Sequence, residues 1–204
     1  MSARARTYGG ATSGERRSKR HAALLEAALD IVADTGVGGL TVRGVCASAR
    51  LNDRYFYENF SSTDELLLAM FDDQVTRASA AMLVAITESA PDPVVRARAA
   101  IGSGLAFLAE DARRGRLLIE SQATDGLRAR RRELVKALAQ VMADQGRALL
   151  AGQEALDPDL DLAALVLVGG GFDLVTGWLR GELDVTRAHL EDFLVAMVTA
   201  RRRA

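Results

Sequence analysis

Polar side chains between residues 43 and 57 have the chemistry needed to read DNA. The Arg54 guanidinium can hydrogen-bond a guanine edge, and the Asn52 carboxamide can pair with adenine. Arg43 lies eleven residues before Arg54, where it can reach either a base or a phosphate. Asp53, Tyr55 and Tyr57 complete the polar set. The sequence therefore predicts a surface that binds the major groove, provided that a stable framework holds these side chains outward.

Apolar residues at helical spacing predict that framework. Thr41 can cap one short helix, a break follows at Arg50–Leu51, and Asn52 can cap a second short helix that carries Phe56 and Phe60. The residues expected to pack these helices together are Val45, Cys46, Leu51, Phe56 and Phe60. Two short helices joined by a tight turn are typical of a helix-turn-helix.

Longer helices flank this pair. Apolar residues at i, i+3, i+4 and i+7 predict a helix over 16–35, with Gly36 as its C-terminal cap. Ser62 and Glu65 form the S-x-x-E pattern of a capping box and predict a long helix toward Ser89. Residues 1–14 are small, polar and interspersed with glycine, so they are expected to be a disordered arm. The arm belongs to a basic region, because six cations stand against one carboxylate in the first twenty residues.

The rest of the chain also has residues that typically begin helices. Asp92-Pro93 and Asp157-Pro158 each place a capping carboxylate before a proline. Helices are predicted over 93–110, 112–123, 126–151, 158–181 and 186–202. The expected fold is all-α with about nine helices: a helix-turn-helix domain over 15–62 and a larger helical domain over 63–204.

Composition excludes several classes of protein. The 49% apolar content is enough to bury a core, and the net charge of −1 leaves only local charge to attract nucleic acid. One cysteine and two histidines far apart in the sequence argue against a disulfide framework or a metal site. Without a phosphate-binding glycine loop or a nucleophile motif, we expect neither an enzyme nor a cofactor. The longest apolar run, residues 162–172, is too short for a membrane span, so a cytoplasmic protein is expected.

Two segments carry a resemblance to a known family. LLEAALDIVADTG and LTVRGVCASARLNDRYFYENFSSTDELL resemble the first four helices of the TetR family of bacterial transcriptional regulators, over about residues 16–72. The resemblance implies that bases are approached by Arg43, Asp53, Arg54 and Tyr55, and that phosphates are contacted by Tyr57, Asn59 and Thr63.

Three departures from the family pattern bear on DNA binding. Thr63 stands where the family usually has a lysine, so a phosphate there must be held by hydroxyls and a helix N-terminus. Arg50 replaces the usual turn glycine, which predicts either a left-handed arginine or a different turn. Asp53 and Glu58 repel phosphate unless they face a base amine or are neutralised by Arg54.

The larger domain has two expected tasks. Reading two half-sites about 34–36 Å apart requires a symmetric dimer, and the resemblance implies that the last two helices of each subunit form its interface. The expected interface residues are Leu165, Val168, Phe172, Val175, Leu190, Phe193, Leu194 and Met197. The second task is ligand binding, for which the candidate pocket walls are Met82, Leu105, Phe107, Leu108, Leu118, Met142 and Trp178. The same seven residues are also consistent with an ordinary core.

The sequence thus predicts a homodimeric regulator, usually a repressor, that binds a palindromic operator in double-stranded DNA. A small hydrophobic or aromatic effector of unknown identity would release it. The alternative is an all-α ligand-binding or interaction protein that no longer reads DNA, and Asp53, Glu58 and Thr63 favour that alternative.

Overall fold

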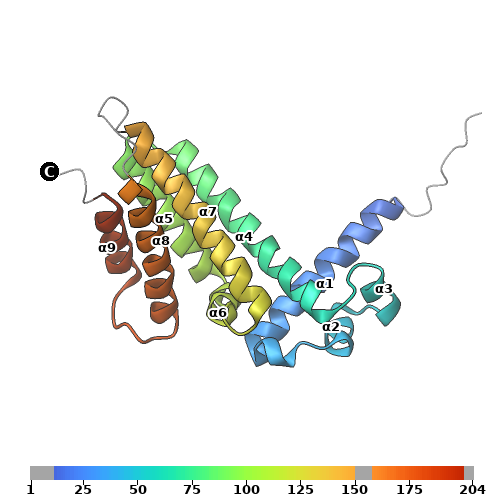
Figure 1. The fold of residues 1–204 in the computed structure, drawn as a ribbon. Coiled ribbons are helices and arrows are strands. Elements are labelled where there is room, and N and C mark those ends of the chain that lie inside the picture. The colour runs from blue at the N-terminus through green and yellow to red at the C-terminus, as the bar shows by residue number, and fades with distance from the viewer. Residues whose placement is uncertain (1–11, 150–157, 200–204) are drawn as a thin grey trace, which may run out of the picture. The chain divides into compact units, whose positions relative to one another are not determined.

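The computed structural model describes residues 12–149 and 158–199, and within them the chain forms nine α-helices and no strand (Figure 1). The helices are α1 (Ser13–Thr35), α2 (Val42–Ala49), α3 (Asp53–Tyr57), α4 (Thr63–Glu88), α5 (Pro93–Glu110), α6 (Ala112–Glu120), α7 (Asp125–Leu149), α8 (Pro158–Leu179) and α9 (Arg187–Thr199). A 3-10 turn, η1 (Val37–Gly39), follows α1. The expected all-α fold is confirmed.

The chain divides into two compact units after Met70. The first contains α1, α2, α3 and the start of α4, and the second contains the rest of α4 and α5 to α9. This division lies eight residues beyond the boundary expected at 62, because the first turns of α4 bury Leu66, Leu67 and Met70.

Helix α1 begins earlier than predicted. Thr12 accepts a hydrogen bond from the Glu15 backbone N–H, and the Glu15 carboxylate accepts one from the Thr12 N–H, so the two form a capping box. The expected start at 16 and the end of the arm at 14 are therefore corrected. Residues 1–11 lie outside the described residues. Four of the six N-terminal cations belong to a regular helix: Arg16, Arg17, Lys19 and Arg20.

The turn after α2 uses a left-handed arginine. Thr41 caps α2 through a hydrogen bond that its hydroxyl accepts from the Gly44 N–H at 3.1 Å, as predicted. At the other end Arg50 has φ 54° and ψ 42°, the conformation that usually selects glycine. Its backbone N–H donates to the Ala47 carbonyl at 3.2 Å. The sequence allowed either a left-handed arginine or a different turn, and the structure has the left-handed arginine.

Aromatic packing seats α3. Phe56 is fully buried and its ring lies 6.0 Å from that of Phe60. Phe60 in turn stacks on the His21 imidazole of α1, with ring centroids 4.8 Å apart. The prediction that Phe60 lies on the same short helix as Phe56 is wrong, because α3 ends at Tyr57 and Phe60 belongs to the link before α4. Both rings still reach the same core.

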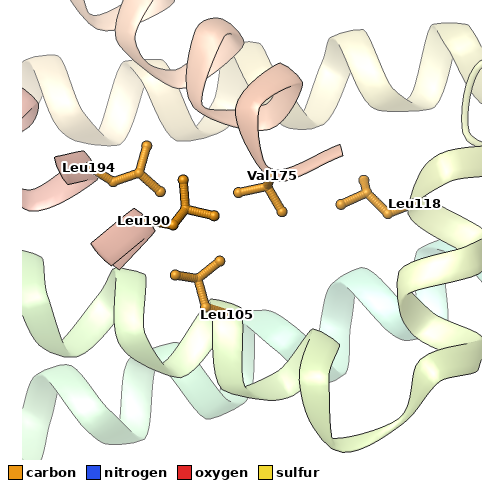
Figure 2. Close-up of a cluster of buried hydrophobic side chains, with 5 residues drawn as sticks. All are labelled: Leu105, Leu118, Val175, Leu190 and Leu194. Carbon is orange, nitrogen blue, oxygen red and sulfur yellow. The ribbon is translucent and has the colours of Figure 1, made fainter. Parts of the chain in front are cut away.

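The second unit is built around one apolar cluster. Leu105 of α5, Leu118 of α6, Val175 of α8 and two leucines of α9 converge there (Figure 2). A smaller cluster of Ala139, Ala143 and Ala164 joins α7 to α8, since alanines let two helices approach closely. Arg147 and Asp161 add an ion pair at 2.9 Å between these two helices.

The predicted helix ends in this unit need small corrections. Helix α6 ends at Glu120 rather than 123, and α8 ends at Leu179 rather than 181. Asp92 caps α5 as expected, through bonds from the N–H groups of Val94 and Val95. The expected cap at Asp157 and the expected helix ends at 151 and 202 lie outside the described residues.

Helix α8 has an unusual surface. Over Asp159–Leu179 it is long and apolar enough to cross a membrane by length and composition, and only 17% of that window is buried. This stretch is longer than the run of 162–172 because it includes Asp161 and Asp173. Core helices of soluble proteins pass the same test, so the observation identifies an apolar helix without assigning it to a membrane.

The left-handed turn gives a stability prediction. Arg50→Gly should raise the free energy of unfolding by about 0.5–1 kcal/mol, because glycine adopts φ 54° without the steric cost of a side chain. The Arg50 side chain is exposed, so little packing is lost. Urea denaturation followed by circular dichroism measures the change. Ala49→Gly, one residue earlier and inside α2, should lower stability instead. A loss of stability in Arg50→Gly would show that the arginine side chain contributes more than the strain costs.

Candidate nucleic-acid interface

Helix α3 presents several exposed candidates for base contact. The Arg54 side chain is 83% exposed and Tyr57 is 61% exposed. Asp53 is exposed on the same helix, and Arg43 is exposed on α2. The burial of Phe56 fixes which face of α3 points outward, because a five-residue helix has only one turn to distribute between core and solvent. The structure therefore gives α3 an outer polar face within the first unit.

Asn52 is occupied as a helix cap. Its side-chain oxygen accepts a hydrogen bond from the Tyr55 backbone N–H at 3.2 Å. A bidentate contact with adenine needs both the oxygen and the nitrogen of the carboxamide. Because the cap already holds this oxygen, the geometry supports a structural role for Asn52 more than base reading.

Tyr55 and Asn59 are less exposed than expected. The Arg20 guanidinium of α1 lies 4.4 Å from the centroid of the Tyr55 ring, a cation–π contact that leaves the tyrosine half-buried. Asn59 is half-buried too, and its Nδ2 donates to the Tyr55 carbonyl at 2.8 Å. The first contact holds α3 against α1 and the second ties the link after α3 to α3, so both residues retain only part of their surface for DNA.

Three arginines surround Glu58. Arg54 Nε lies 3.0 Å from one carboxylate oxygen, and Arg20 lies 3.8 Å from the other. Arg17 donates to the Glu58 backbone carbonyl at 3.1 Å. The expectation that Glu58 repels phosphate unless it is neutralised is thus met by its pairing with Arg54. Exchange of this exposed ion pair for a base contact costs little, since surface pairs contribute about 0–1 kcal/mol.

The start of α4 is already supplied with negative charge. Ser62 accepts a hydrogen bond from the Glu65 N–H at 3.1 Å, but the Glu65 carboxylate accepts from the N–H and hydroxyl of Ser61, at 2.7 and 2.6 Å. Half of the predicted capping box is confirmed, and the reciprocal bond is shifted by one residue. Hydrogen bonds from Ser61 lower the pKa of Glu65. A phosphate near Thr63, which is half-buried, must share this helix end with Asp64 and Glu65.

Cys46 is a packing residue in the first unit. It is buried on α2 without a disulfide. Burial raises the pKa of its thiol, and the hydrogen bond and charge of Asp53 raise it further. A thiol with a raised pKa is a poor nucleophile at neutral pH, so this environment is that of a small apolar side chain.

The seven candidate pocket residues do not share one lining. Leu105 and Leu118 are buried in the cluster of Figure 2, with Leu108 and Trp178 packed against it. Phe107 is buried, and the Arg114 Cζ lies over its ring, 4.0 Å from the ring centroid. Met142 packs against the alanine cluster between α7 and α8. Met82, on α4, is half-buried. The clusters show that at least Leu105 and Leu118 are core residues of the unit.

The expected interface residues fall into two groups. Val175, Leu190 and Leu194 are buried in the subunit's own core, which corrects their assignment to a partner-facing surface. Leu165 and Phe193 are exposed, and Val168, Phe172 and Met197 are half-buried. Sequence reasoning missed two strongly exposed apolar residues on α8, Leu162 and Val166. The helical period predicts an apolar stripe, but it does not say which side of an all-apolar helix faces outward.

The sequence places Arg17 and Arg20 on the predicted helix over 16–35, which α1 confirms, but it shows only their contribution to the positive charge of the first twenty residues. The structure gives both residues specific partners on α3 and the link that follows it. Their spacing from Leu24 could have signalled this, since 17, 20, 21 and 24 follow one helix face. Among the described residues no group of three or more metal-ligating side chains gathers.

The geometry defines a helix-turn-helix protein: a short helix seated by buried aromatic residues and exposing arginine and tyrosine, preceded by a second helix and a tight turn. Residues 24–70 match the family model of bacterial regulatory proteins of the tetR family. The matched segment runs from α1 to the start of α4 and contains α2 and α3.

Solved structures show that the fold extends over most of the chain. A TetR-like transcriptional regulator from Rhodococcus sp. RHA1 is similar, with 21% identity, a TM-score of 0.69 and coverage of 91% of this chain and 97% of that one. The fatty acid degradation regulator FadR from Bacillus halodurans is similar at 16% identity and a TM-score of 0.73, covering 95% and 96%. FadR from Bacillus subtilis in complex with stearoyl-CoA is similar at 20% identity and a TM-score of 0.70, covering 87% and 97%. No curated protein matches the sequence.

The ion pairs of Glu58 give a prediction about charge. Glu58→Gln should change the free energy of unfolding by less than about 1 kcal/mol, because Arg54 is exposed and its ion pair is screened by solvent. The same change should raise affinity for mixed-sequence duplex DNA several-fold, because it removes a negative charge and frees Arg54. Fluorescence anisotropy with a labelled duplex measures the affinity.

Asp34→Asn is the matched control, since it removes one exposed carboxylate near the opposite end of α1. An equal gain in both variants would show that Glu58 acts only through net charge. A loss of affinity in Glu58→Gln would show that the carboxylate positions Arg54 for binding.

Proposed function

We propose that this protein is a homodimeric DNA-binding transcriptional regulator that represses by occupying a palindromic operator in the cytoplasm. The observation that carries the proposal is the outer face of α3, where Arg54 and Tyr57 are exposed while Phe56 is fully buried. A seated recognition helix of this kind fits the major groove. The match of residues 24–70 to the tetR family model supports the same role.

Each contact has a distinct task in this proposal. Arg54 reads base edges, with a contribution from Arg43, while Tyr57 donates its hydroxyl to a phosphate. Asp53 is acceptable near DNA where it accepts a hydrogen bond from a cytosine amine. Tyr55, Asn59 and Thr63 give weaker support because all three are half-buried. Asn52 contributes by capping α3.

The exposed apolar surface of α8 supports the proposed dimer. Leu162, Leu165 and Val166 lie within one turn of each other and are 63%, 42% and 71% exposed. Phe193 of α9 adds an exposed ring. Nothing lies within 4 Å of where a Cβ would be at Gly170, which follows the same face of α8, so a second helix has room to approach. Burial of such apolar area against a second subunit is favourable by about 25 cal/mol per Å².

We further propose that a small apolar ligand releases the DNA. The second unit has an apolar interior built from α5, α6, α8 and α9, and FadR from Bacillus subtilis was solved with stearoyl-CoA. A ligand shifts the balance only by the difference in its affinity for the DNA-binding and released conformations. Helix α4 has residues in both units and is the continuous element through which such a change can pass. The proposed action needs binding alone, without a cofactor or catalysis.

A second candidate function is ligand binding without DNA reading. The acidic groups of Asp53, Asp64 and Glu65 beside the recognition helix favour it. Selection of bound duplexes from a random pool, followed by titration at several salt concentrations, separates the two functions. A regulator selects a palindrome, and its affinity falls steeply as salt rises. The absence of an enriched sequence together with a flat salt response would contradict DNA reading.

Two substitutions on α3 should have different effects on sequence preference. Arg54→Ala should relax discrimination at particular base pairs by about 1–3 kcal/mol, because it removes donors to base edges. Tyr57→Phe should weaken all duplexes alike by about tenfold per half-site, since it removes one hydrogen bond to a charged group. Repeating the selection with each variant measures both effects. An unchanged sequence preference in Arg54→Ala, or an unchanged affinity in Tyr57→Phe, would contradict the assigned role of that residue.

The exposed face of α8 gives a test of the dimer. Val166→Glu should convert the dimer to monomers and lower operator affinity by at least a hundredfold, because it places a charge in the apolar contact. Sedimentation velocity measures the oligomeric state. Val84→Glu on α4, where the valine is 54% exposed, makes the same chemical change as a control and should leave the dimer intact. A dimeric Val166→Glu variant would place the interface elsewhere.

A further inference from the structure

A surface pocket in the first unit joins α1 to the link after α3. It has a volume of about 310 Å³ and is lined by Arg17, Ser18 and His21 of α1 and by Asn59. We refer to it as the α1 pocket. All four lining residues belong to the unit that contains α3, and the side chains of all four can donate a hydrogen bond.

The folding of α1 creates this pocket. The stripe that buries Leu24 and Ala28 continues toward the N-terminus through His21 and Arg17, at intervals of three and four residues. The capping box at Thr12 and Glu15 keeps this end of the chain helical. His21 and Arg17 therefore lie on the same face of α1 as the buried residues, one and two turns before the apolar core begins.

The contacts that position the side chains of the α1 pocket leave some of their hydrogen-bond donors unused. Arg17 donates one N–H to the Glu58 carbonyl at 3.1 Å, and a guanidinium has five N–H groups. His21 packs the face of its ring on Phe60, which leaves the nitrogens at the ring edge. Asn59 uses its amide nitrogen to hold the Tyr55 carbonyl, and its amide retains a second hydrogen. The Glu58 carboxylate is engaged by Arg54 and Arg20, so it does not cancel the charge of Arg17.

The geometry points to a phosphodiester group of the DNA backbone as the occupant. This inference rests on the proposed DNA binding by α3 and adds a contact from α1 to it. A guanidinium together with hydroxyl and amide donors suits the two free oxygens of a phosphate. The first turn of α4 has no positively charged side chain for a phosphate: Thr63 is uncharged, and Asp64 and Glu65 are acidic. Arg17 thus offers a positive charge to the DNA backbone from α1, whereas the first turn of α4 offers none.

The test combines protein variants with single neutral substitutions in the operator. The full-length protein is titrated with its selected operator at several salt concentrations. Arg17→Ala should weaken binding about tenfold per half-site. It should also reduce the slope of log K against log salt by about 1.8 for a dimer, because each phosphate that the protein no longer neutralises accounts for about 0.9. Lys19→Ala, which removes an exposed charge from the same helix outside the pocket, should change both quantities much less.

A methylphosphonate scan of the operator then identifies the phosphate. One neutral linkage in each half-site should weaken the wild-type protein and have no further effect on Arg17→Ala. Arg17→Gln keeps a donor for the Glu58 carbonyl, and it should behave like Arg17→Ala in the scan. If Arg17→Ala weakens binding but still responds to every neutral linkage as the wild type does, Arg17 only supports α3 and the inference is wrong.

Failure of this inference is distinguishable from failure of the proposed function. Suppose that the wild-type protein selects an operator and that Arg17→Ala keeps the full affinity and salt slope. This result would contradict phosphate binding in the α1 pocket and leave the proposed function intact. A wild-type protein that selects no duplex would contradict both. Equal losses in Arg17→Ala and Lys19→Ala would show that α1 acts by diffuse charge and would also overturn the pocket.

Discussion

The burial of Phe56 and Phe60 is the interaction on which the functional surface depends. A helix of five residues has almost no stability of its own, because the cost of nucleation exceeds the gain from one turn. Helix α3 exists because Phe56 is fully buried and Phe60 stacks on His21. The same burial fixes the rotation of the helix and therefore exposes Arg54 and Tyr57. Packing of two apolar rings thus decides which polar groups are available to DNA.

Helix α1 is more than the scaffold for that packing. Its apolar stripe supplies core residues such as Leu24, and its N-terminal turns bring Arg17 and Arg20 to Glu58 and Tyr55. Charge that looks diffuse in the sequence becomes a set of directed contacts in the folded unit. The second unit is organised differently, because one apolar cluster unites four helices while α8 leaves apolar side chains in solvent.

The sequence pattern predicts the helices and their caps well, but it predicts less well which face of each helix is buried. Thr41, Asn52 and Asp92 were identified as caps because capping depends on a few neighbouring residues. The spacing of Val175, Leu190 and Leu194 predicts an apolar stripe but does not show that the subunit's own helices cover it. The interval of four residues between Phe56 and Phe60 predicts one helix, but the chain has already left α3 at Tyr57.

By itself the sequence determined the helical elements, their caps and turns, and the arginine and tyrosine of the recognition segment, because these follow from interactions within about four residues. Only the tertiary structure decided that Glu58 is also paired with Arg20, that Asn59 and Arg17 line one pocket, and that Leu162 and Val166 face solvent. Those facts depend on how separate helices and links meet. Such contacts are set by the packing of whole helix faces, which no local pattern records.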